Sequence, residues 1–187
     1  MKYQITKIKL LVLIFGILSL IFPWMTITYT RKIGEYTWVL YAEYGFLGNI
    51  INTNYGTPDD LSVKSFGLIN WEVYLNLYIY LAPFGILYLF GFMLSLFSVK
   101  YDNKNLKVLS MLSSIICTLA IIFYIIVFIL ISNRIYLEIK SYGIYESFKY
   151  AVGIGFGIIS AILTVLSILL EYYILKKDLK KYFLNQS

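Results

Sequence analysis

Four long stretches of this chain contain no Lys, Arg, Asp or Glu. They cover residues 10–29, 73–99, 108–132 and 150–170. A helix needs about 20 residues to cross a hydrocarbon core of about 30 Å, so each stretch is long enough for one membrane span. The sequence predicts an all-α membrane protein, a four-transmembrane helix bundle with a small extracellular β-hairpin or sheet cap. The predicted spans are 10–29, 73–99, 108–132 and 150–175, within one membrane domain of 187 residues.

The basic residues indicate how the bundle is oriented. Ten of the sixteen Lys and Arg residues lie in three short segments beside the predicted spans, at 1–9, 100–107 and 176–187. By the positive-inside rule these segments are cytoplasmic, and the loops 30–72 and 133–149 lie outside. Lysines at the membrane edge, Lys9 among them, are expected to attract anionic lipid headgroups. The net charge of +6 therefore indicates a multi-pass plasma-membrane protein and no nucleic-acid partner.

The first outer loop has the composition of a small sheet. Residues 37–44, which include Trp38, are rich in β-branched and aromatic side chains and predict a strand. Residues 52–60 form a dense turn cluster around Pro58, and 61–66 alternate as a second strand would. In the second outer loop, residues 135–140 fit either a third strand or an outward extension of the third helix.

The fourth span carries a stripe of small residues. Gly153, Gly157 and Ala161 recur at intervals of four, which places them on one face of a helix. Small residues at this spacing let two helix backbones approach closely inside a membrane. The stripe predicts a helix-packing interface, either within one molecule or against a second subunit.

The residues that usually carry catalysis or bind metals are scarce. The chain has no histidine and one cysteine, Cys117, in the middle of the third stretch. We therefore predict no catalytic residues, no cofactor and no metal site, and interpret Cys117 as a small packing residue. Glu171 is the acidic residue nearest the inner end of a span, and we expect it at the membrane interface with a lysine or water as its partner.

A resemblance to a known family rests on two positions in the first outer region. Trp24 follows the first span, and Gly45-Phe46-Leu47 comes twenty-one residues later. This layout resembles the claudin and peripheral-myelin-protein superfamily, although the second Trp and the two cysteines of that pattern have no counterpart here. The resemblance implies an up-down bundle capped by an outer sheet, acting in adhesion, paracellular sealing or subunit assembly. Trp24 and Tyr29 are expected at the outer membrane interface.

Together these features predict a non-enzymatic membrane protein with a structural or interaction role. It would act as an accessory subunit of a membrane complex, or as a cell-surface assembly or adhesion protein. Its partners would be membrane lipids and either other membrane subunits or further copies of itself. A small transporter or an oligomeric channel is the alternative. The abundance of Ile, Tyr and Lys without His is typical of an AT-rich prokaryotic genome.

Overall fold

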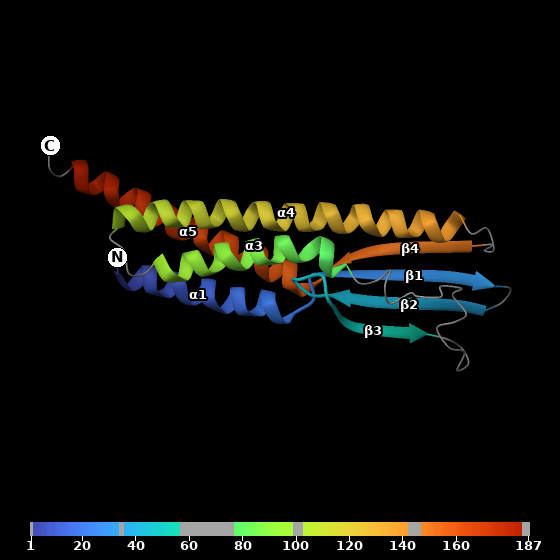
Figure 1. Cartoon of the computed structure of the whole chain (residues 1–187). Helices are drawn as coiled ribbons and strands as arrows, with labels where there is room; N and C mark the ends of the chain where they lie inside the picture. Colours follow the sequence, from blue (N-terminus) through green and yellow to red (C-terminus); the bar gives the residue numbers. More distant parts are fainter. Residues whose placement is uncertain (1, 34–35, 57–76, 99–102, 142–146, 185–187) are drawn as a thin grey trace.

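The computed structural model describes residues 2–33, 36–56, 77–98, 103–141 and 147–184. Within these ranges most of the helices lie at one end of an elongated molecule, the strands extend from the other end along the same direction, and one long helix runs along both parts (Figure 1). In chain order the elements are α1 (Lys2–Ile21), β1 (Met25–Ile33), β2 (Tyr36–Tyr44), β3 (Ile50–Gly56), α3 (Tyr78–Phe97), α4 (Asn103–Ser141), β4 (Ser147–Ile154) and α5 (Phe156–Leu184).

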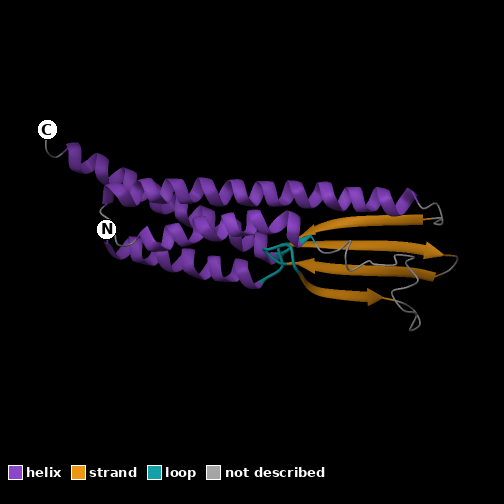
Figure 2. Cartoon of the chain, viewed as in Figure 1, coloured by secondary structure: helices purple, strands orange, loops and turns teal. Residues whose placement is uncertain are grey.

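Three of the described helices are long and apolar enough to cross a membrane. They are Tyr78–Phe97, Asn105–Leu137 and Phe156–Lys177. This finding agrees with a multi-pass membrane protein and with a mostly helical fold that carries a small sheet (Figure 2). Helix α1 packs against α5 along the bundle, and its own crossing of the membrane stays a prediction.

The first apolar stretch does not form a single helix, so the predicted span 10–29 is wrong at its outer end. Helix α1 ends at Ile21, and the last helical hydrogen bond runs from the Phe22 N–H to the Leu18 carbonyl at 3.0 Å. The next residue, Pro23, has no N–H with which to continue the helix. From Met25 the chain continues as β1, in which apolar residues alternate with threonines.

The fourth apolar stretch also begins as a strand, which corrects the predicted span 150–175. Strand β4 runs to Ile154, and α5 begins at Phe156. The cause is an antiparallel pairing between β4 and β1 that extends from Met25 opposite Ile154 to Lys32 opposite Ser147. The backbone groups of the two strands form hydrogen bonds with each other. This pairing makes residues 150–154 a strand, although the stretch is long enough for one helical span.

Helix α4 is much longer than the predicted span 108–132. Its 39 residues extend about 58 Å at 1.5 Å per residue, far beyond a hydrocarbon core of about 30 Å. It takes in residues 135–140, so the predicted extension of the third helix through these residues is confirmed and the strand alternative is wrong. Helix α3 begins at Tyr78, within the predicted span 73–99, whose residues 73–76 lie outside the described ranges.

The four strands form one antiparallel sheet in the order β3-β2-β1-β4. The strand predicted at 37–44 is confirmed as β2. Strand β3 contains residues 52–56, where the sequence predicted a turn, because Glu43 pairs with Asn52 and the ladder continues to Val39 opposite Gly56. The predicted strand 61–66 and Pro58 lie outside the described residues.

One face of the sheet packs against the C-terminal part of α4. Tyr29 and Tyr44 point to this face and are buried, and the Tyr44 ring meets Phe128 of α4 edge-on at 5.2 Å between centroids. Further out, Tyr150 of β4 stacks on Tyr136 of α4 at 4.7 Å. The predicted position of Tyr29 at the membrane interface is therefore wrong, since its ring belongs to the core between sheet and helix.

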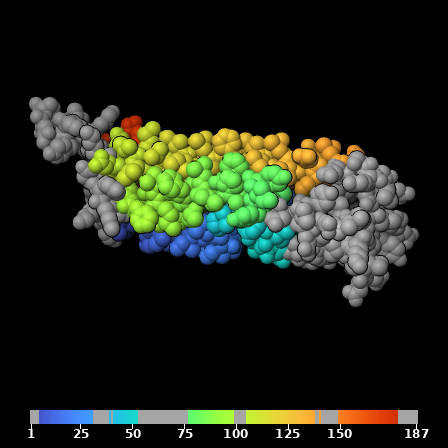
Figure 3. Space-filling model, in the orientation of Figure 1, coloured from blue at the N-terminus to red at the C-terminus, as the bar shows by residue number. Residues whose placement is uncertain are grey.

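Helices α3 and α4 pack side by side over the length of α3 (Figure 3). The contact is close at Gly91, where an added Cβ would lie 2.7 Å from the Cys117 sulfur. Cys117 is fully buried, which confirms its prediction as a packing residue. The Ser113 hydroxyl donates to the Gly91 carbonyl at 2.6 Å and adds a polar link between the two helices.

Candidate functional site

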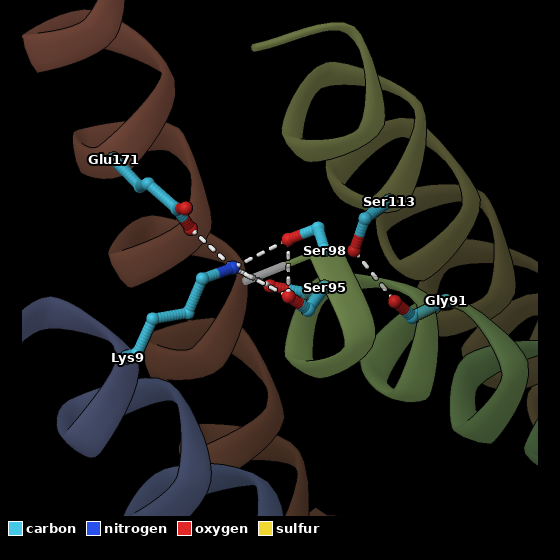
Figure 4. Close-up of polar contacts among 6 residues, drawn as sticks. All are labelled: Lys9, Gly91, Ser95, Ser98, Ser113 and Glu171. Atoms are coloured by element: carbon cyan, nitrogen blue, oxygen red, sulfur yellow. Dashed lines mark hydrogen bonds and ion pairs between the residues drawn. The ribbon is translucent and has the colours of Figure 1, made fainter. Parts of the chain in front are cut away.

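A buried ion pair joins the first and last helices of the chain. The Lys9 ammonium of α1 lies 2.9 Å from Oε2 of Glu171 on α5, and both side chains are almost completely shielded from solvent. Figure 4 shows the two side chains reaching toward each other between their helices, with α3 close by. Charged side chains inside a membrane bundle are rare and usually mark a functional or assembly site, so we take this pair as the centre of the candidate site.

The lysine side of the pair is well supplied with hydrogen-bond acceptors from the end of α3. The ammonium donates to the Ser95 carbonyl, to the Ser98 hydroxyl at 2.8 Å and to the Ser95 hydroxyl at 3.3 Å. The last carbonyls of a helix have no partner in the helix itself and lie at the negative end of its dipole. A lysine at this position is therefore stabilised by α3 as well as by the carboxylate.

The glutamate side has fewer partners. Oε1 of Glu171 is buried and has no hydrogen-bond donor among the residues that the structure describes. The buried Ser110 hydroxyl of α4 lies beside the carboxylate, although their geometry does not make a hydrogen bond. Lys9 is therefore the main source of stabilisation for the Glu171 charge, whereas Lys9 itself has several acceptors. This asymmetry determines how the two residues should respond to substitution.

The sequence prediction is wrong for the position of Lys9 and is confirmed for the partner of Glu171, which is a lysine. Lys9 was expected to face lipid headgroups and is instead buried in the bundle, which is a correction. Glu171 was expected to have a lysine or water as its partner, and the structure supplies Lys9, which lies 162 positions earlier in the chain (171 − 9). One signal in the sequence was available: Lys9 and Glu171 carry opposite charges and lie directly next to the inner ends of the first and last apolar stretches.

A second cluster lies at the junction of bundle and sheet and is aromatic. Trp24 is completely buried there, and its indole N–H donates to the Ser19 carbonyl at 2.7 Å. Its ring packs against Tyr88 of α3 at 5.1 Å and Tyr124 of α4 at 4.8 Å between centroids. The predicted place of Trp24 at the outer interface is therefore wrong, because its indole N–H is bonded inside the protein.

The aromatic cluster also holds the turn between β2 and β3. The Tyr124 hydroxyl donates to the Gly45 carbonyl, and the Gly45 N–H donates to the Asn49 carbonyl at 2.8 Å. Gly48 in the same turn has a φ of 77°, a conformation that favours glycine. Gly45, for which the sequence predicted a structural role, therefore lies in a tight turn that is hydrogen-bonded to α4.

Only two of the three residues of the predicted small-residue stripe lie on the same helix. Gly153 lies in β4, opposite Thr26, so it does not share a helix face with Gly157 and Ala161 of α5. An added Cβ at Gly157 would lie 2.4 Å from the Phe22 carbonyl oxygen, and Ala161 is completely buried. Around Gly157 the close approach therefore occurs within one molecule, between α5 and the chain that leaves α1.

The two other positions predicted for the outer-loop structure, Trp38 and Pro58, are not part of either cluster of described side chains. Trp38 lies in β2 with its backbone opposite Arg31 of β1, and Pro58 is outside the described residues. Among the described residues no group of three or more His, Cys, Asp or Glu side chains is arranged to hold a metal ion.

The chain matches no known protein-family model, and no curated protein matches it.

Proposed function

We propose that this chain is a non-enzymatic integral membrane protein that acts by holding an extracellular sheet in a fixed position for interaction with other membrane proteins. In this proposal both termini are cytoplasmic, α1 crosses the membrane as the fourth span, and the sheet lies outside. The protein would serve as an accessory subunit of a membrane complex or as an assembly or adhesion protein. The resemblance to the claudin and peripheral-myelin-protein superfamily is part of this proposal.

The main support is the rigid connection between sheet and bundle. Trp24, Tyr88 and Tyr124 come from three separate segments and pack together where the two parts meet. The Gly155 N–H donates to the Trp24 carbonyl at 2.9 Å, which ties the start of α5 to the start of β1. A sheet connected in this way cannot swing freely on its helices, and this is the property that an interaction platform needs.

The face of the sheet turned away from α4 offers suitable chemistry for a partner. Thr26 and Thr28 of β1 are half-buried there, and Glu43 and Tyr41 of β2 lie opposite them in the ladder. The Tyr41 hydroxyl donates to Glu43 at 2.9 Å, which holds both side chains in place. Preordered hydroxyl and carboxylate groups lose little conformational entropy on binding.

The test is site-specific photocrosslinking in native membranes, followed by extraction in mild detergent. A photoreactive residue at position 28 or 41 should crosslink one partner, and the same partner should co-purify at constant stoichiometry. A matched probe at Ile86, an exposed position in α3, should not crosslink that partner. A homogeneous homo-oligomer without any other subunit would rule out the accessory-subunit form of the proposal.

Transport is the second candidate, and the Lys9–Glu171 pair is the observation that favours it. Ionisable residues inside membrane bundles often lie on ion or proton pathways. Against this, Lys9 has its donors engaged by Ser95, Ser98 and Glu171, which is the arrangement of a clamp between helices. Proton or ion flux into liposomes containing the purified protein, abolished by Glu171→Gln, would favour transport over the interaction role.

A further inference from the structure

An exposed apolar patch lies where α1, β4 and α5 meet. We call it the junction patch and define it by Ile21, Phe22, Ile154 and Phe156. Phe156 is 70% exposed and Ile154 is 63% exposed, although Ile154 is the last residue of a strand. The Phe22 and Phe156 rings meet edge-on with centroids 6.5 Å apart, so the patch is contiguous at this point. Apolar surface of this kind normally marks contact with lipid or with another protein.

The backbone beneath the patch is fixed. The Gly157 N–H donates to the Pro23 carbonyl at 2.8 Å, and an added Cβ at Gly155 would lie 2.1 Å from that same oxygen. The end of α1 and the start of α5 are therefore pressed together at this level. The four patch residues cannot turn inward without breaking these contacts.

Helix geometry places the patch at one edge of a bilayer. On α5, the exposed residues Phe156 and Tyr173 are 17 positions apart, which corresponds to about 26 Å along a helix. On α3, the exposed residues Tyr80 and Phe97 are also 17 positions apart and give the same length. Two helices thus carry exposed aromatic rings at a spacing close to the hydrocarbon thickness of about 30 Å.

The charged residues agree with these boundaries. Lys176 and Lys177 are exposed one turn beyond Tyr173, and Lys149 is exposed on β4, on the outer side of Ile154. A tyrosine followed by lysines is typical of the boundary between hydrocarbon and headgroups. A bilayer accounts for this agreement between two helices, whereas contact with a second protein does not by itself predict it.

We propose that the junction patch lies at the outer boundary of the hydrocarbon core, against the acyl chains next to the headgroups, so that the base of the sheet is inserted into the membrane surface. This inference rests on the proposed function only in placing α3 and α5 across a bilayer. It replaces the predicted interfacial residues Trp24 and Tyr29, which are buried, by a different set of side chains. It also places the membrane boundary within β4: Lys149 is five residues from Ile154, about 16 Å along a strand, and lies in water.

The experiment measures the depth of single labels in liposomes. In a Cys117→Ala background, a bimane fluorophore is attached after Ile154→Cys, after Lys149→Cys and, as a mid-span reference, after Ile86→Cys. We expect the label at 154 to be quenched several-fold more by nitroxides on lipid headgroups than by aqueous iodide. The label at 149 should show the reverse preference, and the label at 86 should respond to nitroxides in the middle of the acyl chains. A label introduced by Phe156→Cys serves as the second probe if Ile154→Cys does not fold.

The possible failures are distinguishable. If the label at 86 is quenched by acyl-chain nitroxides but those at 154 and 156 are as accessible to iodide as the label at 149, the junction patch is not in the membrane and the inference is wrong. If the label at 86 is not quenched by lipid either, α3 does not cross the bilayer, and the membrane placement in the proposed function fails with it.

Discussion

Removing one member of the Lys9–Glu171 pair should cost more stability than removing both. At 2.9 Å the two charges attract by about 6 kcal/mol at an effective dielectric constant of about 20, but much of this gain is offset by their desolvation. Losing one partner of a buried pair typically costs about 3–5 kcal/mol, because the remaining charge stays buried. Replacing both by apolar residues of similar volume is often neutral or stabilising.

The contacts of the pair make the two single substitutions unequal. Lys9→Met leaves the Glu171 carboxylate without its cation and with no described hydrogen-bond donor, so we expect a loss of about 3–5 kcal/mol. Glu171→Gln leaves Lys9 with the Ser95 carbonyl and the Ser98 hydroxyl, so the loss should be smaller, about 1–3 kcal/mol. The free energy of unfolding of the double variant Lys9→Met/Glu171→Met should be within about 1 kcal/mol of that of the natural protein, or higher.

The assay is reversible unfolding in mixed micelles by titration with SDS, followed by tryptophan fluorescence. A double-mutant cycle gives the coupling free energy between the two positions directly. Lys177→Met is the matched control, because Lys177 is an exposed lysine on α5, and its loss should change stability by less than about 0.5 kcal/mol. If both single variants cost less than about 1 kcal/mol and their effects simply add, the pair does not clamp the bundle and the reasoning is wrong.

Three other substitutions test the junction and the sheet by thermal unfolding in detergent. Trp24→Phe removes the indole bond to Ser19 and part of the ring packing, and should cost about 1–3 kcal/mol, whereas an interfacial Trp24 would tolerate the change. Gly157→Ala places a methyl group 2.4 Å from the Phe22 carbonyl and should cost about 1–3 kcal/mol; an unchanged midpoint would contradict the close approach. Burial raises the pKa of Tyr44 above its ordinary value of 10. Above that pH the hydroxyl loses its proton more readily in the unfolded state, so the folded state loses stability as the pH rises. Tyr44→Phe should weaken that alkaline decline, and an identical pH profile would contradict burial of this hydroxyl.

The sequence allowed the helices to be predicted better than their ends. Uncharged stretches correctly indicated long apolar helices at α3, α4 and α5, and β-branched and aromatic residues correctly indicated β2. The two spans whose ends form strands were predicted too long because an apolar run fits a membrane helix and a buried strand equally well. Residues 25–29 and 150–154 became strands because they pair with each other, and this long-range pairing cannot be found from local composition.

The candidate site was missed for a related reason. A lysine near the end of an apolar stretch usually extends its ammonium to the headgroups, and this is the expectation that a single sequence supports for Lys9. Whether the side chain points to lipid or to the bundle depends on which face of α1 meets α5 and α3. That choice is made by contacts such as the one between Gly16 and the Phe92 ring, where an added Cβ would lie 2.1 Å away.

The Lys9–Glu171 pair and the aromatic cluster around Trp24 stabilise different parts of the molecule. The effects of substitutions in them can therefore be measured separately. Among the described elements, α4 runs along both the bundle and the sheet (Figure 1). The Lys9–Glu171 pair lies at the far end of the bundle, whereas Trp24 and Tyr124 lie at the junction. Single substitutions in the pair should therefore lower the amount of folded protein without changing how a folded molecule presents its sheet. Substitutions at the junction should change the orientation of the sheet, and with it partner binding, even in molecules whose helices remain folded.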